Sequence, residues 1–379
     1  MRLFRKSARG RVPRLELILS SGVAIGGLER LVYHLARRLD PTRLVASVRL
    51  VGARGTFAEW VLAELPDRAV WYDRSLVELA RLRSDLRREL PSVVHASGLF
   101  ARGLTLAAVP HAPAVDTVAN PDLEHGTVRR YAYRGIGKLA AAYWADSRAR
   151  ADVGIERLGI PRDRIRVIYP GVDEVTIGAE AQRAFLERHG LRATDKIVAV
   201  VGNLRVLKGH DRLVEIAQEV TKRDPSVVFV LAGADLSRGE IPRLLEGSSA
   251  RRNIRLTGFV DDPLPLMAAS AVVLQPSRSE GVPRVTLEAM SVGAAILSTA
   301  VGGIPEVLTH EETGVLVPAN SVGQLTRSLI ELLEAPARRA ELGARARERV
   351  RARFGLDRMV REFEELYLGA AARTVDSRQ

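Results

Sequence analysis

Two glutamates with seven residues between them, Glu280 and Glu288, lie in the stretch SRSEGVPRVTLEAMSVGAAILSTAVGGIPE. The apolar run 271–274 before them predicts a strand, and Pro283 between them suits the start of a helix. The open N-terminus of a helix offers unpaired N–H groups and the positive end of the helix dipole, which suit a phosphate. Carboxylates on either side could accept hydrogen bonds from hydroxyls. The pattern therefore favours a sugar joined through a diphosphate to a ribose.

Helix geometry supports separate tasks for the two carboxylates. Glu288 stands five residues past Pro283, which is about 7.5 Å along a helix axis. Glu280 precedes the helix and would reach a different part of the ligand. A retaining glycosidase needs two carboxylates that flank one bond at about 5 Å, and this pair does not fit that arrangement.

Two cations follow an earlier predicted strand in the loop GNLRVLKGHD, where Arg205 and Lys208 come after Gly202. Positive side chains just past a strand end suit phosphate binding. In isolation, two solvated surface cations would explain the same residues. A second glycine loop, SSGVAIGGLER, places Gly26 and Gly27 before a helix, where a ligand could approach the backbone closely. A plain strand-to-helix turn is the alternative, and the absence of G-x-G-x-x-G argues against a dehydrogenase.

The elements that must position these residues form a regular series. Short apolar, β-branched runs alternate with helical patterns along almost the whole chain, which is typical of repeated βαβ units with parallel sheets. Strands are expected near 15–20, 45–51, 70–72, 93–95, 115–118, 143–146, 166–168, 197–201, 227–232, 254–257, 271–275, 294–298 and 314–317.

The length of 379 residues predicts two domains, each able to bury its own core. The first is expected over 1–174, because IYPGVD reads as its close, and the second over 175–352. The remaining residues, 353–379, are expected to form a C-terminal helix and a tail.

Composition limits the function class. The net charge of +12 favours nucleic acid, an anionic membrane or phosphorylated ligands, although a GC-rich genome also explains the arginine excess. The absence of cysteine excludes disulfides and thiolate metal sites. No apolar run approaches the ~20 residues of a membrane span. The basic N-terminal residues and the basic, aromatic segment 128–144 could each contact an anionic membrane or simply be solvated.

Taken together in order, the motifs resemble the family-four retaining glycosyltransferases of the two-Rossmann-domain type, the GT-B fold. The resemblance covers nearly the whole chain and is carried by GGLER, PSVVHASG, YWADSRARADVGIERLGIPRDRIRVIYPGVD, VGNLRVLKGHDRLVEIA, EGVPRVTLEAM, AVGGIPEVL and TGVLVP. The E-x7-E segment most resembles group 1 enzymes that assemble cell-surface polysaccharides and glycolipids.

The resemblance implies two Rossmann-like, doubly wound parallel-sheet domains that face each other across a cleft, with the last helix crossing back onto the first domain. A nucleotide sugar, with a UDP or GDP moiety, would bind mainly to the second domain. The acceptor, a lipid-linked saccharide or a polysaccharide, would lie against the first.

Roles transfer by matching position. The resemblance assigns Glu280 to the donor sugar, Glu288 to the ribose hydroxyls, and Lys208 with Arg205 to the diphosphate as negative charge grows on the leaving group. The backbone amides near Val285 and Thr286 would assist, and Gly26 and Gly27 would let the first domain approach the phosphates.

No D-x-D motif stands where a metal-dependent transferase would need one, because Asp261 and Asp262 are adjacent. The enzyme is therefore expected to need no metal and no other cofactor. Many relatives have a histidine after a "TVH" strand, whereas here Thr117-Val118 is followed by Ala119 and Asn120. Asn120 could hydrogen-bond in its place. His95 is a second acceptor-side candidate, although a lone histidine of this kind often serves the core.

The leading hypothesis is a cytoplasmic, metal-independent retaining glycosyltransferase that lies peripherally on the inner face of the plasma membrane. One alternative is a catalytically impaired relative, because Ala119 follows Thr117-Val118 where many relatives have the histidine, and Asn203 follows the loop glycine where many have an arginine. A non-hydrolysing sugar-nucleotide epimerase is another alternative. A basic membrane- or nucleic-acid-binding protein would explain the charge but neither the glycine loops nor the glutamates, so no nucleic-acid partner is expected.

Overall fold

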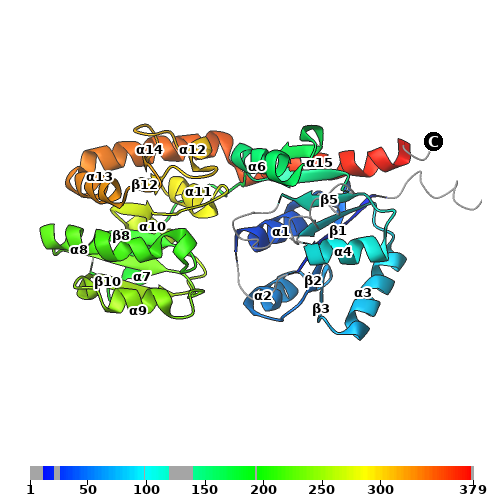
Figure 1. The fold of residues 1–379 in the computed structure, drawn as a ribbon, viewed down its shortest axis with the longest axis horizontal. Coiled ribbons are helices and arrows are strands. Elements are labelled where there is room, and N and C mark those ends of the chain that lie inside the picture. The colour runs from blue at the N-terminus through cyan, green and yellow to red at the C-terminus, as the bar shows by residue number, and fades with distance from the viewer. Residues whose placement is uncertain (1–11, 21–25, 98, 119–139, 193, 377–379) are drawn as a thin grey trace, which may run out of the picture. The chain divides into compact units, whose positions relative to one another are not determined.

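The computed structural model describes residues 12–20, 26–97, 99–118, 140–192 and 194–376 (Figure 1). Residues 1–11, Asn120 and residues 128–139 of the segment 128–144, for which the sequence suggested membrane or acceptor contacts, lie outside the described residues. The chain divides into two compact units. Unit 1 is Met1–Tyr169 with Asp357–Gln379, and unit 2 is Pro170–Leu356. The sequence had suggested divisions after 174 and 352.

Unit 1 contains a seven-stranded parallel sheet in the order β3-β2-β1-β4-β5-β6-β7. The chain therefore turns from one half of the sheet to the other between β1 and β4, which is the switch point of a doubly wound fold. Its elements are β1 (Arg14–Leu19), α1 (Gly27–Arg38), β2 (Val45–Val51), α2 (Thr56–Glu64), β3 (Ala69–Tyr72), α3 (Leu76–Glu89), β4 (Val93–Ser97), α4 (Leu99–Ala108), β5 (Ala114–Thr117), β6 (Ala142–Ala145), α6 (Arg148–Leu158), β7 (Ile165–Val167) and α15 (Leu356–Asp376).

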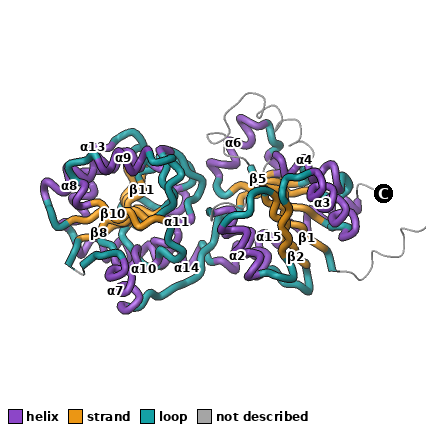
Figure 2. Tube along the Cα trace, turned by 90° about the horizontal axis from the view of Figure 1, so that it is seen from below, coloured by secondary structure: helices purple, strands orange, loops and turns teal. Residues whose placement is uncertain are grey.

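Unit 2 contains a six-stranded parallel sheet in the order β10-β9-β8-β11-β12-β13, with its switch point between β8 and β11. Figure 2 shows helices around the strands of each sheet. The elements are α7 (Ala179–Arg188), β8 (Lys196–Val201), α8 (Leu213–Arg223), β9 (Val227–Ala232), α9 (Glu240–Glu246), β10 (Ile254–Gly258), α10 (Leu264–Ala269), β11 (Val272–Gln275), α11 (Arg284–Ser291), β12 (Ile296–Thr299), α12 (Ile304–Val307), β13 (Val315–Val317), α13 (Val322–Glu334) and α14 (Pro336–Arg353).

Every strand that the sequence predicted is present, with its ends shifted by at most two residues. The core explains why local patterns sufficed. On α8, Leu213, Ile216, Ala217 and Val220 recur at helical spacing and are all buried against the unit 2 sheet. Strands such as β9 are buried on both faces and read as continuous apolar runs.

The last helix, α15, packs within unit 1. Its Met359, Phe363 and Tyr367 side chains, four residues apart and so on one face of the helix, are buried. Phe363 stacks on His95 of β4, with ring centroids 6.3 Å apart, and makes an edge contact with Trp144 of β6. This aromatic cluster holds the end of the chain against strands that precede it by more than 200 residues.

Candidate functional site

The residues singled out in the second half of the sequence converge at the β8–β11 switch point of unit 2. The loop after β8 carries Lys208, and the loop after β11 carries Glu280. Because β8 and β11 are parallel neighbours, their carboxyl ends lie at one edge of the sheet. Ligands of open α/β sheets bind at this edge, beside the switch point.

Lys208 and Glu280 form an ion pair at this edge. The Lys208 ammonium donates to both Glu280 carboxylate oxygens, at 2.6 and 2.7 Å, and the Ser277 hydroxyl donates to the first of them at 2.8 Å. The Glu280 side chain is 9% exposed, whereas that of Lys208 is 34% exposed. An ammonium has three donors, so Lys208 can hold Glu280 and still donate to a third group from the solvent side.

A second ion pair ties the two loops together. Arg278 donates to both carboxylate oxygens of Asp211 at 2.6 Å, and one of its guanidinium nitrogens also donates to the Val206 carbonyl at 2.6 Å. The Arg278 N–H donates to the Leu207 carbonyl at 2.9 Å. Burial raises the pKa of the Asp211 carboxyl, but hydrogen bonds from Arg278 outweigh it and leave the pKa below its usual value.

Two glycines allow the loops to approach this closely. Gly209 has φ +75°, and a Cβ there would overlap with the Pro276 carbonyl. Gly302, after β12, has φ +54°, and a Cβ there would overlap with the carbonyl of Glu280 itself. Only glycine combines a left-handed backbone with this lack of side-chain volume. Gly302 therefore abuts the Glu280 backbone itself, and Gly209 abuts the same loop four residues earlier, at Pro276.

The loop after β8 is also braced from within by His210, which is 1% exposed. Its Nδ1 lies 3.1 Å from the Arg205 carbonyl oxygen and 3.2 Å from the Arg205 nitrogen. Burial, more than the neighbouring Lys208 charge, lowers the pKa of His210. The Arg205 side chain, which the sequence assigned to the diphosphate, is exposed at this edge.

Glu288 lies on α11, the helix that begins four residues after Glu280. Arg284 donates to its carboxylate at 2.7 Å, and both side chains are mostly buried, at 18% and 13% exposure. Thr286 is directed inward, because its hydroxyl donates to Gln275 at 2.7 Å and its N–H donates to the Pro283 carbonyl at 3.0 Å. Val285, in the same first turn, is only partly buried.

The first-domain candidates fall into three groups. Gly26 is the residue before α1, and Gly27 is exposed with no atom within 4 Å of a Cβ placed there, so this backbone is approachable. His95 is 2% exposed, and its ring nitrogens lie 2.7 Å from the Tyr367 hydroxyl and 3.1 Å from the Thr117 hydroxyl. Burial lowers the pKa of His95 to about 4. These are the contacts of a core residue. Asn120 lies outside the described residues.

Some features of the site could be anticipated and others could not. Arg284 stands four residues before Glu288, and this spacing brings side chains together on a helix, so the pair was accessible from the sequence. Arg278 and Asp211 are 67 residues apart, and no local pattern joins them.

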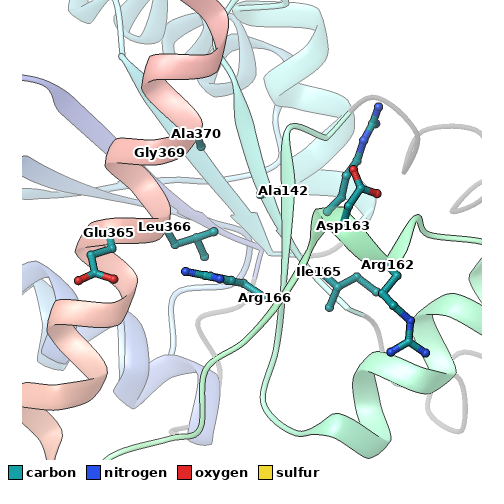
Figure 3. A pocket seen from close by; sticks show the side chains of 10 residues that line it. Ala142, Arg162, Asp163, Ile165, Arg166, Glu365, Leu366, Gly369 and Ala370 are labelled. Carbon is teal, nitrogen blue, oxygen red and sulfur yellow. The ribbon is translucent and has the colours of Figure 1, made fainter.

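A cavity of about 430 Å³ in unit 1 lies elsewhere (Figure 3). It is bounded by residues 162–166 and by Leu366, Gly369 and Ala370 of α15, at the amino ends of β6 and β7. That is the opposite edge of the sheet from the ligand-binding carboxyl ends, and it contains none of the predicted site residues.

In the part of the chain that the structure describes, no group of three or more histidine or acidic side chains could hold a metal ion. None of the described helices has both the length and the apolar character that crossing a membrane requires.

Two family models match the chain. Residues 25–175 match Glycosyltransferase Family 4, and residues 181–349 match Glycosyl transferases group 1. The fold and these matches define a glycosyltransferase of the GT-B fold. The chain belongs to the group 1 glycosyltransferases, with a first domain of family 4.

Two relatives of known activity are each less than 30% identical to the chain. The chain is 27% identical over 308 residues to alpha-D-kanosaminyltransferase of Streptomyces kanamyceticus, covering 76% of this chain and 79% of that protein. It is 28% identical over 208 residues to N-acetyl-alpha-D-glucosaminyl L-malate synthase of Bacillus anthracis, covering 55% of this chain. That match spans about half of the relative, 54% of its length.

Among solved structures, Anabaena Alr3699/HepE in complex with UDP-glucose has a TM-score of 0.80 and 20% sequence identity, covering 96% of this chain and 99% of that chain. At this identity the likeness concerns the fold.

Proposed function

We propose that this protein is a retaining glycosyltransferase that moves a sugar from a UDP- or GDP-sugar to a lipid-linked saccharide or polysaccharide. The reaction would need no metal ion. The protein would be cytoplasmic and would lie peripherally on the inner face of the plasma membrane. The observation that carries the proposal is the Lys208–Glu280 pair at the unit 2 switch point, beside the start of α11. Such an edge combines a cation for phosphate with carboxylates for hydroxyls.

In the reaction, the bond between the anomeric carbon of the sugar and the diphosphate oxygen breaks, and the diphosphate leaves with the electron pair. A new bond forms between that carbon and the acceptor oxygen. Family resemblance suggests attack from the same face, with the acceptor proton passing to the departing phosphate oxygen. The anomeric configuration is then retained.

The chain's own residues would stabilise this step as follows. The third donor of the Lys208 ammonium and the exposed guanidinium of Arg205 would meet the negative charge on the leaving diphosphate. The first turn of α11, at Val285, would add backbone N–H groups. Glu280 would accept hydrogen bonds from sugar hydroxyls. Glu288, which also accepts a hydrogen bond from Arg284, would accept hydrogen bonds from the ribose hydroxyls.

The site assignment is tested with Lys208→Ala and Glu288→Ala. The measurement is a thermal-shift screen against a panel of UDP- and GDP-sugars, followed by turnover with the one that binds. A ligand present at 100 times its Kd adds about 2.7 kcal/mol of stability to the wild type, and we expect both variants to lose most of it. Lys222→Ala, an exposed lysine of α8, is the matched control.

Unchanged turnover in Lys208→Ala or Glu288→Ala would remove these residues from the site. The product separates the remaining possibilities. A transferred sugar with the donor's anomeric configuration, seen by NMR, supports retention, whereas an epimerised nucleotide sugar would identify the epimerase alternative.

A further inference from the structure

Helix α3 of unit 1 presents apolar side chains to water. Leu76 and Val77, in its first turn, are 86% and 75% exposed, more than any other large apolar side chain among the described residues. The opposite face of α3 packs on the core, because Leu82 and Leu86 are buried against the sheet beside α4. Contiguous exposed apolar surface is a feature of sites that a membrane or another molecule covers.

Two exposed arginines lie at the same edge of the sheet as this apolar pair. The Arg74 guanidinium lies over the Phe100 ring at 4.9 Å, and that of Arg54 over the Trp71 ring at 5.7 Å. Both arginines are exposed, and Phe100 is 39% exposed. Together, Arg54, Arg74, Leu76, Val77 and Phe100 form what we call the α3 rim.

The acidic residues of α3 do not neutralise these cations. Glu78 pairs with Arg81 at 3.3 Å, and Asp85 pairs with Arg88 at 2.9 Å. Glu89 pairs with Arg14. The acids of the helix are thus matched by other arginines. Asp73, which precedes Arg74, accepts a hydrogen bond from the Ser75 N–H at 2.7 Å, so one carboxylate offsets part of the positive charge that Arg54 and Arg74 bring to this edge.

The rim also lies at a functional edge. Arg54 follows β2, Arg74 follows β3, and Phe100 follows β4. Because these strands are parallel, the three residues share the carboxyl edge of the sheet with Gly26 and Gly27, which follow β1. This is the edge at which unit 1 would receive a ligand. In Figure 1, α3 and α4 lie side by side in unit 1.

We propose that the α3 rim docks unit 1 on an anionic lipid bilayer. Leu76 and Val77 enter the boundary between headgroups and acyl chains, while Arg54 and Arg74 contact lipid phosphates. The inference rests on the membrane location in the proposed function and names the surface responsible for it.

The shape of the patch favours a bilayer over a protein partner. Beyond the first turn the outer face of α3 is mostly polar, because Arg81, Ser84 and Arg88 are exposed there. The next strongly exposed leucine, Leu90 at 72%, is the C-cap at the far end of the helix. A partner helix would need an apolar stripe along several turns. An apolar tip with two exposed arginines at the same edge of the sheet suits the boundary of an anionic bilayer, where each basic residue near the surface adds to binding.

The experiment is cosedimentation of the full chain with phosphatidylcholine vesicles that contain phosphatidylglycerol. We expect the wild type to bind, and to bind less at high salt because the cations are screened. Leu76→Ser/Val77→Ser should bind at least tenfold more weakly. Arg54→Gln/Arg74→Gln should also bind more weakly and lose most of its salt dependence. Leu244→Ser, at a 44% exposed leucine of unit 2, is the control.

The outcomes separate this inference from the proposed function. Equal vesicle binding by wild type and Leu76→Ser/Val77→Ser overturns the inference alone. No binding by the wild type overturns it together with the membrane location, while a thermal shift with a nucleotide sugar would still support the transferase. Self-association of the wild type that the variant loses, seen by sedimentation velocity, would show that a second copy covers the rim and would also overturn the inference. Unchanged nucleotide shifts confirm that each variant is folded.

Discussion

Replacing Arg278 with alanine tests whether the geometry of the candidate site depends on the pair between its two loops. In the native chain Arg278 holds both oxygens of Asp211 and the Val206 carbonyl, each at 2.6 Å. Lys208 lies two residues beyond Val206, and Glu280 two residues beyond Arg278. The substitution leaves Lys208 and Glu280 themselves unchanged but removes the clamp that sets their separation.

The magnitude follows from burial and geometry. The Arg278 and Asp211 side chains are 34% and 26% exposed. Exposed ion pairs contribute about 0.2–1 kcal/mol, and hydrogen bonds to charged groups about 1.5–3 kcal/mol. A half-buried bidentate pair should therefore contribute about 2 kcal/mol. For a domain of this size that lowers the Tm of unit 2 by about 4–8 °C. Displacing Lys208 and Glu280 should lower kcat/KM by about tenfold to a hundredfold.

Thermal unfolding and donor kinetics of Arg278→Ala check these values, with Arg223→Ala as control. Arg223 pairs with Glu334 at 2.8 Å, but the side chains are 62% and 56% exposed, so its loss should cost less than about 0.5 kcal/mol. Because Arg278 leaves the pKa of Asp211 below its usual value, the pair stabilises the fold above the unfolded pKa of about 4. Its contribution is lost as the pH falls further. Equal Tm values for the two variants, or unaltered kinetics in Arg278→Ala, would refute the clamp.

Three further outcomes are expected. Burial lowers the pKa of His95 to about 4, from about 6.5 in the unfolded chain, so folded unit 1 binds fewer protons than the unfolded chain between these pH values. The free energy of unfolding should therefore fall by about 3 kcal/mol as the pH falls from about 6.5 to about 4. Urea unfolding of His95→Gln should show a weaker pH dependence than the wild type. Gly209→Ala should cost at least about 2 kcal/mol, because of its φ of +75° and the overlap with the neighbouring loop, whereas Gly323→Ala, with open space in α13, should stabilise by about 0.5–1 kcal/mol in thermal scans. Glu16→Ala should cost about 3–5 kcal/mol, because it strands the buried Arg49, while replacing both partners with methionine should be close to neutral in the same urea assay.

The architecture was largely accessible from local patterns. Strands such as β9 are continuous apolar runs, and helices such as α8 repeat apolar residues at helical spacing. Alternation of the two predicts parallel sheets, because parallel strands require crossover helices. Boundaries were less exact. The units divide at Pro170 and Asp357, whereas composition and motif order suggested 174 and 352.

The candidate site was accessible as separate pieces. Glu280, Glu288 and Lys208 were singled out because their residue types at the ends of strands and helices suit a nucleotide sugar. The Arg284–Glu288 pair follows from helical spacing, but the contact between Lys208 and Glu280, 72 residues apart, has no local signal. The structure shows that Lys208 donates directly to Glu280 and that Arg284 occupies Glu288. The structure also places His95 in the core. The sequence around a single histidine does not indicate whether its side chain is buried.

The sequence by itself determined the elements, the two sheets and the identity of the charged residues at their carboxyl edges. The spacing of apolar residues and the positions of glycine and proline set local backbone conformation, and these effects extend over only a few neighbouring residues. Only the tertiary structure decided which distant loops meet. The Arg278–Asp211 clamp, the glycines that Pro276 and Glu280 require, and the exposure of Leu76 all depend on how the chain returns to itself. Contacts between residues far apart in sequence leave no periodic trace, since each partner only needs the right residue type at its own position.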